Sequence, residues 1–515
     1  AEMMKARGLA RAAWTRQLTT HSQFTLGGSK ASSLSNPTLF RESAFIDGEW
    51  VISTESVAVT DPATQELLGH VPHLGLAETR RAIDAAFAAL PAWRNRPAAE
   101  RGALLKRWHS LILEHKMDLA HIMTREQGKP VGEAAGEIAY AASFVEWFGE
   151  EAKRAYGDVI ASPQIDKRLL VVKQPIGVCA AITPWNFPAA MITRKAAAAL
   201  AAGCTMVVKP SELTPFSALA LAALAEEAGI PKGVLNVVTC GSGNAAEVGG
   251  ELTSHRAVKK VSFTGSTGVG KRLMAQCAGT MKKLSLELGG NAPFIVFEDA
   301  DIDAAVVGAI AAKFRNAGQT CVCANRFYVH TSVHDEFVQK LSKAMDALLV
   351  GPGIEQGVMQ GPLINEAAVE KVEAHVSDAI GKGAQLMAGG SRHSLGGTFF
   401  QPTLLTGVTA EMDVTQQETF GPLAPVYRFE TEAEVVSAAN DVPAGLACYF
   451  YARDLARVWR VSEALEYGMV GVNTGIISNE VAPFGGVKES GVGREGSRYG
   501  IDEYLQIKYI AHGGL

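Results

Sequence analysis

The sequence predicts an α/β fold with a mainly parallel sheet covered by helices on both faces. The first observation is an alternation of β-rich runs and helical segments between residues 177 and 263. The second is a further α/β region after Gly290. The third is the length of 515 residues, which exceeds one simple core and indicates two or three domains. The expected elements are strands at 177–182, 205–208, 234–238, 261–263 and 326–330, and helices at 189–202, 217–228, 302–314 and 335–349.

Composition excludes several classes of protein. Hydrophobic residues make up 47% of the chain and charged residues 20%, which is typical of a globular protein. The formal net charge of −5 argues against a nucleic-acid partner, because such binders are usually basic. No apolar run reaches the roughly 18 residues of a membrane span. Seven scattered cysteines make a disulfide framework improbable and fit a reducing compartment.

Residues 1–42 differ from the rest of the chain. They are rich in arginine, lysine, serine and threonine and contain only two acids, Glu2 and Glu42. Such a composition is typical of an organelle transit peptide, so we expect a mitochondrial matrix protein whose mature chain starts near Phe40. The alternative is a flexible tail, in which case the protein would be cytoplasmic.

Four short segments carry the chemistry: 183–188 (TPWNFP), 263–267 (FTGST), 287–290 (ELGG) and 318–323 (GQTCVC). They supply an amide, a glycine turn, a carboxylate and a thiol. In this order and spacing the chain resembles the NAD(P)-dependent aldehyde dehydrogenase family, from about Phe45 to Gly513. The resemblance implies a Rossmann-like cofactor domain, a second α/β catalytic domain and a small β oligomerisation arm.

The resemblance also implies domain boundaries and an oligomer. The expected domains are residues 43–154 with 176–288 for the cofactor, residues 289–486 for catalysis, and residues 155–175 with 492–515 for the arm. Strands of the arm would pair between subunits and give a homodimer or a homotetramer.

Cys321 is the expected nucleophile. An arbitrary cysteine is more often a small buried hydrophobe, and we expect that of the other cysteines outside this segment. The match to the family's GQTC reverses this reading for Cys321. By resemblance, the Asn186 amide and the Cys321 backbone N–H stabilise the oxyanion, and Glu287 activates water. Neighbouring leucines suggest that Glu287 is buried with a raised pKa.

The glycine-rich stretch 265–271 nearly matches a phosphate-binding loop of the Gly-x4-Gly-Lys-Ser/Thr type. It fails at Arg272, where a hydroxyl is needed to bind Mg²⁺, so an NTPase is the weaker alternative. We expect NAD rather than NADP, because the Glu212 carboxylate can accept a hydrogen bond from a ribose hydroxyl and would repel a 2′-phosphate. The cofactor-binding residues implied by the family are Thr183, Trp185, Lys209, Ser211, Glu212, Gly265, Ser266, Gly270, Glu418 and Phe420.

Arg194, Arg315 and Ser478 match family positions that bind a substrate carboxylate, and we expect both arginines to approach the substrate mouth. These positions narrow the resemblance to members that oxidise succinate semialdehyde to succinate, as in the last step of 4-aminobutanoate breakdown. The open alternatives are glutarate semialdehyde, a broader aldehyde specificity, or a non-catalytic structural protein that reuses the fold.

Cys323 follows the nucleophile by two residues. If the chain is extended here, both side chains point the same way, and a reversible Cys321–Cys323 disulfide could disable the nucleophile. The alternative is a bystander thiol. His330 and His334 have i, i+4 spacing, but no third ligand is evident and we expect no metal.

Overall fold

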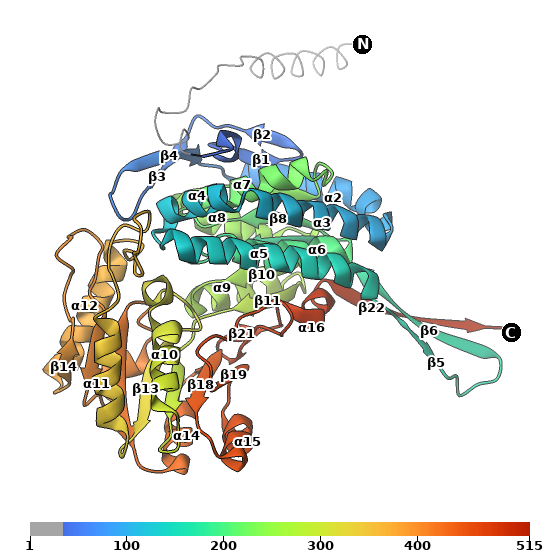
Figure 1. Ribbon diagram of the computed structural model, residues 1–515. Helices are drawn as coiled ribbons and strands as arrows, with labels where there is room; N and C mark the ends of the chain where they lie inside the picture. Colours follow the sequence, from blue (N-terminus) through green and yellow to red (C-terminus); the bar gives the residue numbers. More distant parts are fainter. Residues whose placement is uncertain (1–33, 515) are drawn as a thin grey trace. The chain divides into compact units, whose positions relative to one another are not determined.

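Two large sheets organise the chain in the computed structural model, in which residues 34–514 are described (Figure 1). The first sheet has eight strands. The central five pair in parallel, and the outer three each pair antiparallel with their neighbours. In spatial order they are β2 (Glu49–Val51), β1 (Ala44–Ile46), β9 (Leu235–Val237), β8 (Thr205–Lys209), β7 (Val178–Ile182), β10 (Val258–Thr264), β11 (Lys283–Glu287) and β21 (Gly491–Val492).

Helices cover both faces of this sheet, so a central strand such as β7 is buried along its whole length. One face packs against α2 (Leu76–Asn95), α8 (Ser242–Ser254) and α9 (Thr267–Ala278). The second group of helices is α3 (Ala98–Glu114), α4 (Lys116–Gln127), α5 (Val131–Glu151), α6 (Ala190–Ala202) and α7 (Pro215–Glu227). Within it α5 packs on α6, and α6 packs on β7 and β8. Short elements nearby are η2 (Pro37–Leu39), η3 (Ala152–Arg154), α16 (Ser497–Asp502) and the hairpin β3 (Ser56–Thr60) with β4 (Leu67–Pro72).

The second sheet has seven strands and is parallel except for β14. Its order is β14 (Gln385–Ala388), β15 (Thr403–Thr406), β16 (Leu423–Phe429), β13 (Ala324–His330), β12 (Ala292–Val296), β18 (Ala447–Tyr451) and β19 (Met469–Val472). Alternate residues of β12 enter two different core clusters, Phe294 one and Ile295 the other, so both faces are covered. The associated helices are α10 (Ile302–Lys313), η4 (Arg315–Gly318), α11 (His334–Met345), α12 (Glu366–Gly381), α13 (Asp413–Gln416), α14 (Glu432–Asn440) and α15 (Leu455–Ala464).

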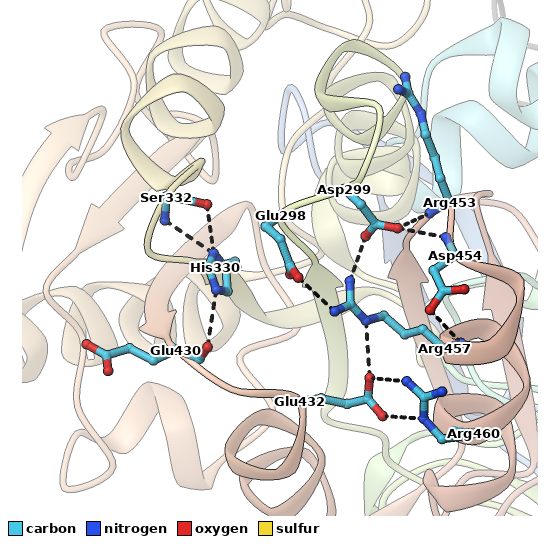
Figure 2. A network of polar contacts seen from close by, with 10 residues as sticks. All are labelled: Glu298, Asp299, His330, Ser332, Glu430, Glu432, Arg453, Asp454, Arg457 and Arg460. Atoms are coloured by element: carbon cyan, nitrogen blue, oxygen red, sulfur yellow. Dashed lines mark hydrogen bonds and ion pairs between the residues drawn. The ribbon is translucent and has the colours of Figure 1, made fainter.

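A network of ion pairs ties α15 to the end of β12 and to the start of α14 (Figure 2). The Arg457 guanidinium donates to Glu298 at 2.7 Å, to Asp299 at 2.8 Å and to Glu432 at 3.1 Å. It also lies over the Phe297 ring, 4.6 Å from the centroid. Every charge in this set has a partner. We therefore infer that the network stabilises the second sheet and has no part in catalysis.

A three-stranded antiparallel sheet extends away from both large sheets in Figure 1. Its strands are β22 (Leu505–Gly513), β6 (Lys167–Pro175) and β5 (Asp158–Ile160), with β6 in the middle. Along β22 every residue after Leu505 is exposed, including Ile507 and Tyr509. The two outer strands present unpaired backbone groups within this chain, a feature that proteins usually cover by pairing.

The predicted α/β class with parallel sheets is confirmed, and several details differ. Helix α11 ends at Met345 rather than at residue 349. The glycine-rich segment before residue 493 contains β21, which pairs with β11, so residues 492–504 accompany the first sheet before the arm begins. Residues 38–42, expected in the tail, belong to the compact unit Thr38–Leu515. The transit-peptide prediction for residues 1–33 lies outside the described residues. In residues 34–514 no helix is both long and apolar enough to cross a membrane.

Candidate active site

Cys321 lies between two cavities and lines both of them. The larger, of about 310 Å³, also contains Arg194, Arg315 and Ser478. The smaller, of about 280 Å³, contains Asn186, Glu287 and the glycine turn at Gly265. Asn186 and Gly265 follow the carboxyl ends of β7 and β10, and Glu287 ends β11, which is the edge where parallel α/β sheets bind ligands. The four predicted segments therefore meet at one place.

The loop before Cys321 has an unusual backbone. Asn316, Ala317 and Gly318 all have left-handed φ angles, at 51°, 53° and 76°. A Cβ on Gly318 would lie 2.1 Å from the Gly421 carbonyl oxygen, so only glycine fits there. Left-handed non-glycine residues cost on the order of 1–3 kcal/mol each and concentrate at functional sites. This backbone leads directly into the Cys321 segment, whose side chain lines both cavities.

Hydrogen bonds to two carbonyl groups join the Asn186 loop to the Cys321 loop. The Asn186 side-chain amide donates to the Gln319 carbonyl at 3.1 Å. The Asn316 amide donates to the same carbonyl at 3.2 Å and to the Asn186 carbonyl at 3.1 Å. Lys129 Nζ also donates to the Asn186 carbonyl, at 2.7 Å. One loop follows β7 of the first sheet and the other precedes β13 of the second. These bonds therefore link the two sheets at the site.

A buried ion pair supports this arrangement, and the sequence analysis missed it. Lys129 pairs with Glu137 of α5, and both side chains are almost completely buried. Glu137 Oε1 accepts hydrogen bonds from the backbone N–H groups of Ala189 and Ala190, at 3.0 and 3.3 Å, where α6 begins. The signal in the sequence was the position of Glu137 on the apolar face of α5, at helical spacing from Ala134 and Ala141. A buried carboxylate at such a position needs a partner.

The Cys321 side chain is half-buried, and its thiol lies in a site of low dielectric. Burial raises the pKa of Cys321 to about 12, and the guanidinium of Arg194 partly opposes this shift. The resting thiol is therefore protonated at neutral pH, and the side chain reacts as a thiolate only when its proton is removed.

Glu287 is buried, as the sequence suggested. Neither of its carboxylate oxygens forms a hydrogen bond within the described chain. Burial raises the pKa of Glu287, and the nearby Glu495 carboxylate raises it further, while Arg194 and Lys195 oppose the shift. Glu495, which the sequence analysis also missed, pairs with both cations and accepts a hydrogen bond from Ser262 Oγ at 3.2 Å. An unpartnered carboxylate beside a thiol is available to bind and deprotonate a water molecule.

The two predicted substrate arginines lie in the same cavity but differ in their partners. Arg194, on α6, lines this cavity as expected, but its side chain is almost completely buried, pairs with Glu495 and lies over the Phe484 ring at 4.4 Å. Its role in binding the substrate carboxylate stays a prediction. Arg315 is half-buried and has no ion pair within the described residues, and its Nε lacks a hydrogen-bond partner. Ser478 lines the cavity beside it. Arg315 is thus the cation available to an added anion.

The predicted cofactor residues fall into two groups. Trp185, Gly265, Ser266, Glu418 and Phe420 line the smaller cavity, where the Trp185 and Phe420 rings meet edge to face at 5.6 Å. Burial raises the pKa of Glu418 to about 7, and this side chain accepts a hydrogen bond from the Gly290 backbone N–H at 3.0 Å.

The second group lies outside the lining of that cavity and continues along the sheet edge. The Thr183 backbone N–H donates to the Lys209 carbonyl at 3.1 Å, and Lys209 Nζ lies 3.9 Å from the Glu212 carboxylate. Ser211 Oγ accepts a hydrogen bond from the Leu213 N–H at 3.2 Å, and a Cβ on Gly270 would meet the Leu288 side chain at 2.4 Å.

These residues fit a dinucleotide. Ser266 is the N-cap of α9, and the start of a helix presents backbone N–H groups to a phosphate. The Thr183 hydroxyl is buried without a partner in the described chain, and a polar ligand would satisfy it. The NTPase alternative loses support because Lys271 points to Glu489, with Nζ 2.8 Å from its carboxylate, on the exposed surface.

The geometric basis of the predicted Cys321–Cys323 disulfide is wrong. The chain turns here instead of running extended, since the Cys323 N–H donates to the Thr320 carbonyl at 2.9 Å. Cys323 is buried, and its Sγ donates to the Lys313 carbonyl at 3.6 Å, whereas Cys321 faces the cavities. The disulfide itself stays a prediction, and it would require this turn to rearrange.

The two histidines with helical spacing are not on one helix. His330 ends β13 and contacts Ser332 and the Glu430 carbonyl (Figure 2). His334 begins α11. No group of three or more His, Cys, Asp or Glu residues within 34–514 is placed to hold a metal ion.

Comparisons with known proteins show the family of this chain. The model of the aldehyde dehydrogenase family matches residues 50–510. The chain is 64% identical to a glutarate-semialdehyde dehydrogenase of Pseudomonas aeruginosa over 484 residues, which cover 94% of this chain and 100% of that protein. It is 63% identical to the succinate-semialdehyde dehydrogenase [NADP(+)] of Escherichia coli over 482 residues, or 93% of this chain and 99% of that one.

A crystal structure of succinate-semialdehyde dehydrogenase from Burkholderia pseudomallei superposes with a TM-score of 0.92 at 63% identity, covering 94% of this chain and 100% of the other. The same fold thus recurs in solved structures. The chain belongs to the aldehyde dehydrogenase family and has its fold.

Proposed function

We propose that this aldehyde dehydrogenase oxidises succinate semialdehyde to succinate with NAD, the last step of 4-aminobutanoate breakdown. The observation that carries the proposal is Arg315, a cavity-lining cation without an ion pair in the described chain, together with Ser478 and Cys321 in the same cavity. An arginine fork binds a carboxylate bidentately. An aldehyde with a distal carboxylate could therefore place its two ends on Arg315 and Cys321.

Relatives named for glutarate semialdehyde and for succinate semialdehyde are about equally similar to this chain, so glutarate semialdehyde is the second candidate. Both substrates carry the same two functional groups and differ by one methylene. The convergence of Cys321, Asn186 and Glu287 gives no support to a non-catalytic structural role.

The first half of the reaction uses Cys321 and Asn186. As sulfur attacks the aldehyde carbon, the thiol proton passes to solvent water, the C=O π pair moves to oxygen, and a thiohemiacetal forms. Negative charge on the aldehyde oxygen is stabilised by the Asn186 amide, whose second N–H is not used in its bond to Gln319, and by the Cys321 backbone N–H. NAD held along Trp185, Ser266 and Phe420 would supply the two-electron acceptor that this oxidation needs. Loss of hydride from the thiohemiacetal leaves a thioester on Cys321.

The second half uses Glu287. The Glu287 carboxylate takes a proton from water, the hydroxide attacks the thioester carbon, and the C–S bond breaks to release the acid and the thiol. The cluster of Glu495, Arg194 and Lys195 sets the charge around this base. Only the ionised carboxylate can act, so this step requires a pH above the raised pKa of Glu287.

Glu212 supports NAD as the cofactor. It follows β8 beside Lys209, and a 2′-phosphate placed there would face a carboxylate. The Escherichia coli relative is named for NADP(+), so this preference is proposed for the present chain from its own residue.

The three-stranded arm supports assembly into a homodimer or homotetramer. Its edge strands β5 and β22 expose apolar side chains, among them Val159, Ile507 and Tyr509. Pairing with a second copy would cover both the backbone edge and these side chains. A mitochondrial matrix location is also proposed, on the composition of residues 1–42 alone.

Glu287→Gln should abolish steady-state turnover. About one NADH per active site should still form in the first turnover. In the wild type, kcat should rise with pH along a limb above the ordinary glutamate pKa near 4.5, because the carboxylate form is the base. Stopped-flow absorbance of NADH between pH 5 and pH 9 measures both. A variant that keeps full turnover with the same pH limb would exclude Glu287 as the base.

Arg315→Met should lower kcat/KM for succinate semialdehyde by about 10- to 100-fold, as expected for hydrogen bonds to a charged group of about 1.5–3 kcal/mol. Butanal, which has the same chain length and no carboxylate, should be oxidised as in the wild type. The matched control is Arg453→Met, which removes an exposed arginine paired with Asp301. Equal losses for both substrates would contradict a carboxylate site at Arg315.

Glu212→Ala should raise the ratio of kcat/KM for NADP to that for NAD by at least about tenfold, since the repelling charge is removed. Initial rates with each dinucleotide at saturating aldehyde measure this ratio. Glu227→Ala removes an exposed glutamate on α7 and serves as the control. An unchanged ratio would show that Glu212 does not determine the choice of cofactor.

A further inference from the structure

Tyr140 places a phenolic hydroxyl in the larger cavity, and the proposed mechanism has not used it. The residue lies on α5 and lines the cavity with Arg194, Arg315 and Cys321. The hydroxyl oxygen is buried and donates to no acceptor in residues 34–514, and the Arg194 guanidinium is the neighbouring group that can donate to it. Its ring packs edge-on against Phe144, with centroids 4.8 Å apart, which helps to orient the ring.

No acceptor in the described part of the chain is bonded to this hydroxyl: the two carboxylates that line the same cavity, Glu133 and Glu137, accept from other groups. Burial raises the pKa of Tyr140 to about 12, so the group stays a neutral phenol at neutral pH, able to donate one hydrogen bond and to accept others. The cations that act on it are Arg194 and Arg315, and guanidinium groups only donate. A buried hydroxyl without a partner costs about 1–3 kcal/mol. The cavity therefore holds a donor that is directed at no protein acceptor.

We propose that the Tyr140 hydroxyl donates a hydrogen bond to the distal carboxylate of the aldehyde, alongside Arg315 and Ser478. The inference rests on the proposed function and adds a residue that determines specificity. The carboxylate is the end that it binds, because the aldehyde end is held by Asn186, which lines the smaller cavity, whereas Tyr140 lines only the larger. A carboxylate has about four lone-pair sites, enough for an arginine fork and two hydroxyl groups.

The proposal also explains a choice of residue type. Phenylalanine would fill the same volume against Phe144 and would leave no unpaired polar atom, so the hydroxyl has no packing role of its own. Among apolar aldehydes the hydroxyl would remain without a partner, which disfavours them. Tyr140 would thus favour acids and discriminate against uncharged substrates in the same cavity.

The test is Tyr140→Phe, which removes only the oxygen. We expect kcat/KM for succinate semialdehyde to fall by about 10- to 100-fold, mainly through KM, because the lost hydrogen bond is to a charged group. The kcat/KM for butanal should stay the same or rise. The matched control is Tyr451→Phe, a buried tyrosine on β18 that lines neither cavity, and it should change neither value.

The outcomes separate this inference from the function on which it rests. A wild-type enzyme that oxidises butanal and succinate semialdehyde equally well would overturn the proposed substrate class and the role of Tyr140 together. A wild-type preference for the acid that persists in Tyr140→Phe would overturn the role of Tyr140 alone, as would equal losses on both substrates. If Tyr140→Phe unfolds at a lower temperature than the wild type, Tyr140→Met, which also lacks the hydroxyl, must show the same loss of preference for the acid; otherwise the proposal fails.

Discussion

The active site depends on two carbonyl groups, those of Asn186 and Gln319, that accept hydrogen bonds across the junction of the two sheets. A rigid hold is needed because an oxyanion donor acts only when it is correctly placed before the charge develops. The left-handed backbone at Asn316 and Ala317 is unfavourable by itself, and the Asn316 amide bonds help to offset its cost. The Asn316 bonds therefore both stabilise the strained loop and hold the Asn186 loop beside Cys321.

Buried charge is the second constraint. Lys129 with Glu137, and Glu495 with Arg194 and Lys195, bring ionised groups into an apolar interior, where each needs a partner. Beside these pairs, Glu287 has no direct hydrogen bond and Arg315 no ion pair in the described chain. These two groups face the thiol from different cavities. The charges left without protein partners are thus the ones that chemistry and substrate can use.

Local sequence patterns predicted the sheets and brought the right motifs to one place, because strand and helix periods and glycine turns are short-range features. The missed residues have partners far along the chain: Glu137 bonds to Ala189, and Glu495 to Lys195. No short pattern reveals such pairs. The error at Cys323 has a related cause, since extended geometry was assumed where the strained loop turns after Thr320. Likewise, burial of Arg194 by Glu495 could not be read from its distance to Asn186 in the sequence.

The central claim is that the Asn316 bonds hold the two loops together for attack on the aldehyde. Its most direct test is the pre-steady-state rate of NADH formation in Asn316→Gly, which removes both amide bonds and adds no backbone strain, because glycine accepts a left-handed φ. Asn473→Gly is the control, since Asn473 also has a left-handed φ and bonds twice to the backbone of Ala452. The account predicts a first-turnover rate at least about tenfold lower in Asn316→Gly and a normal rate in the control. Equal first-turnover rates in both variants and the wild type would contradict it.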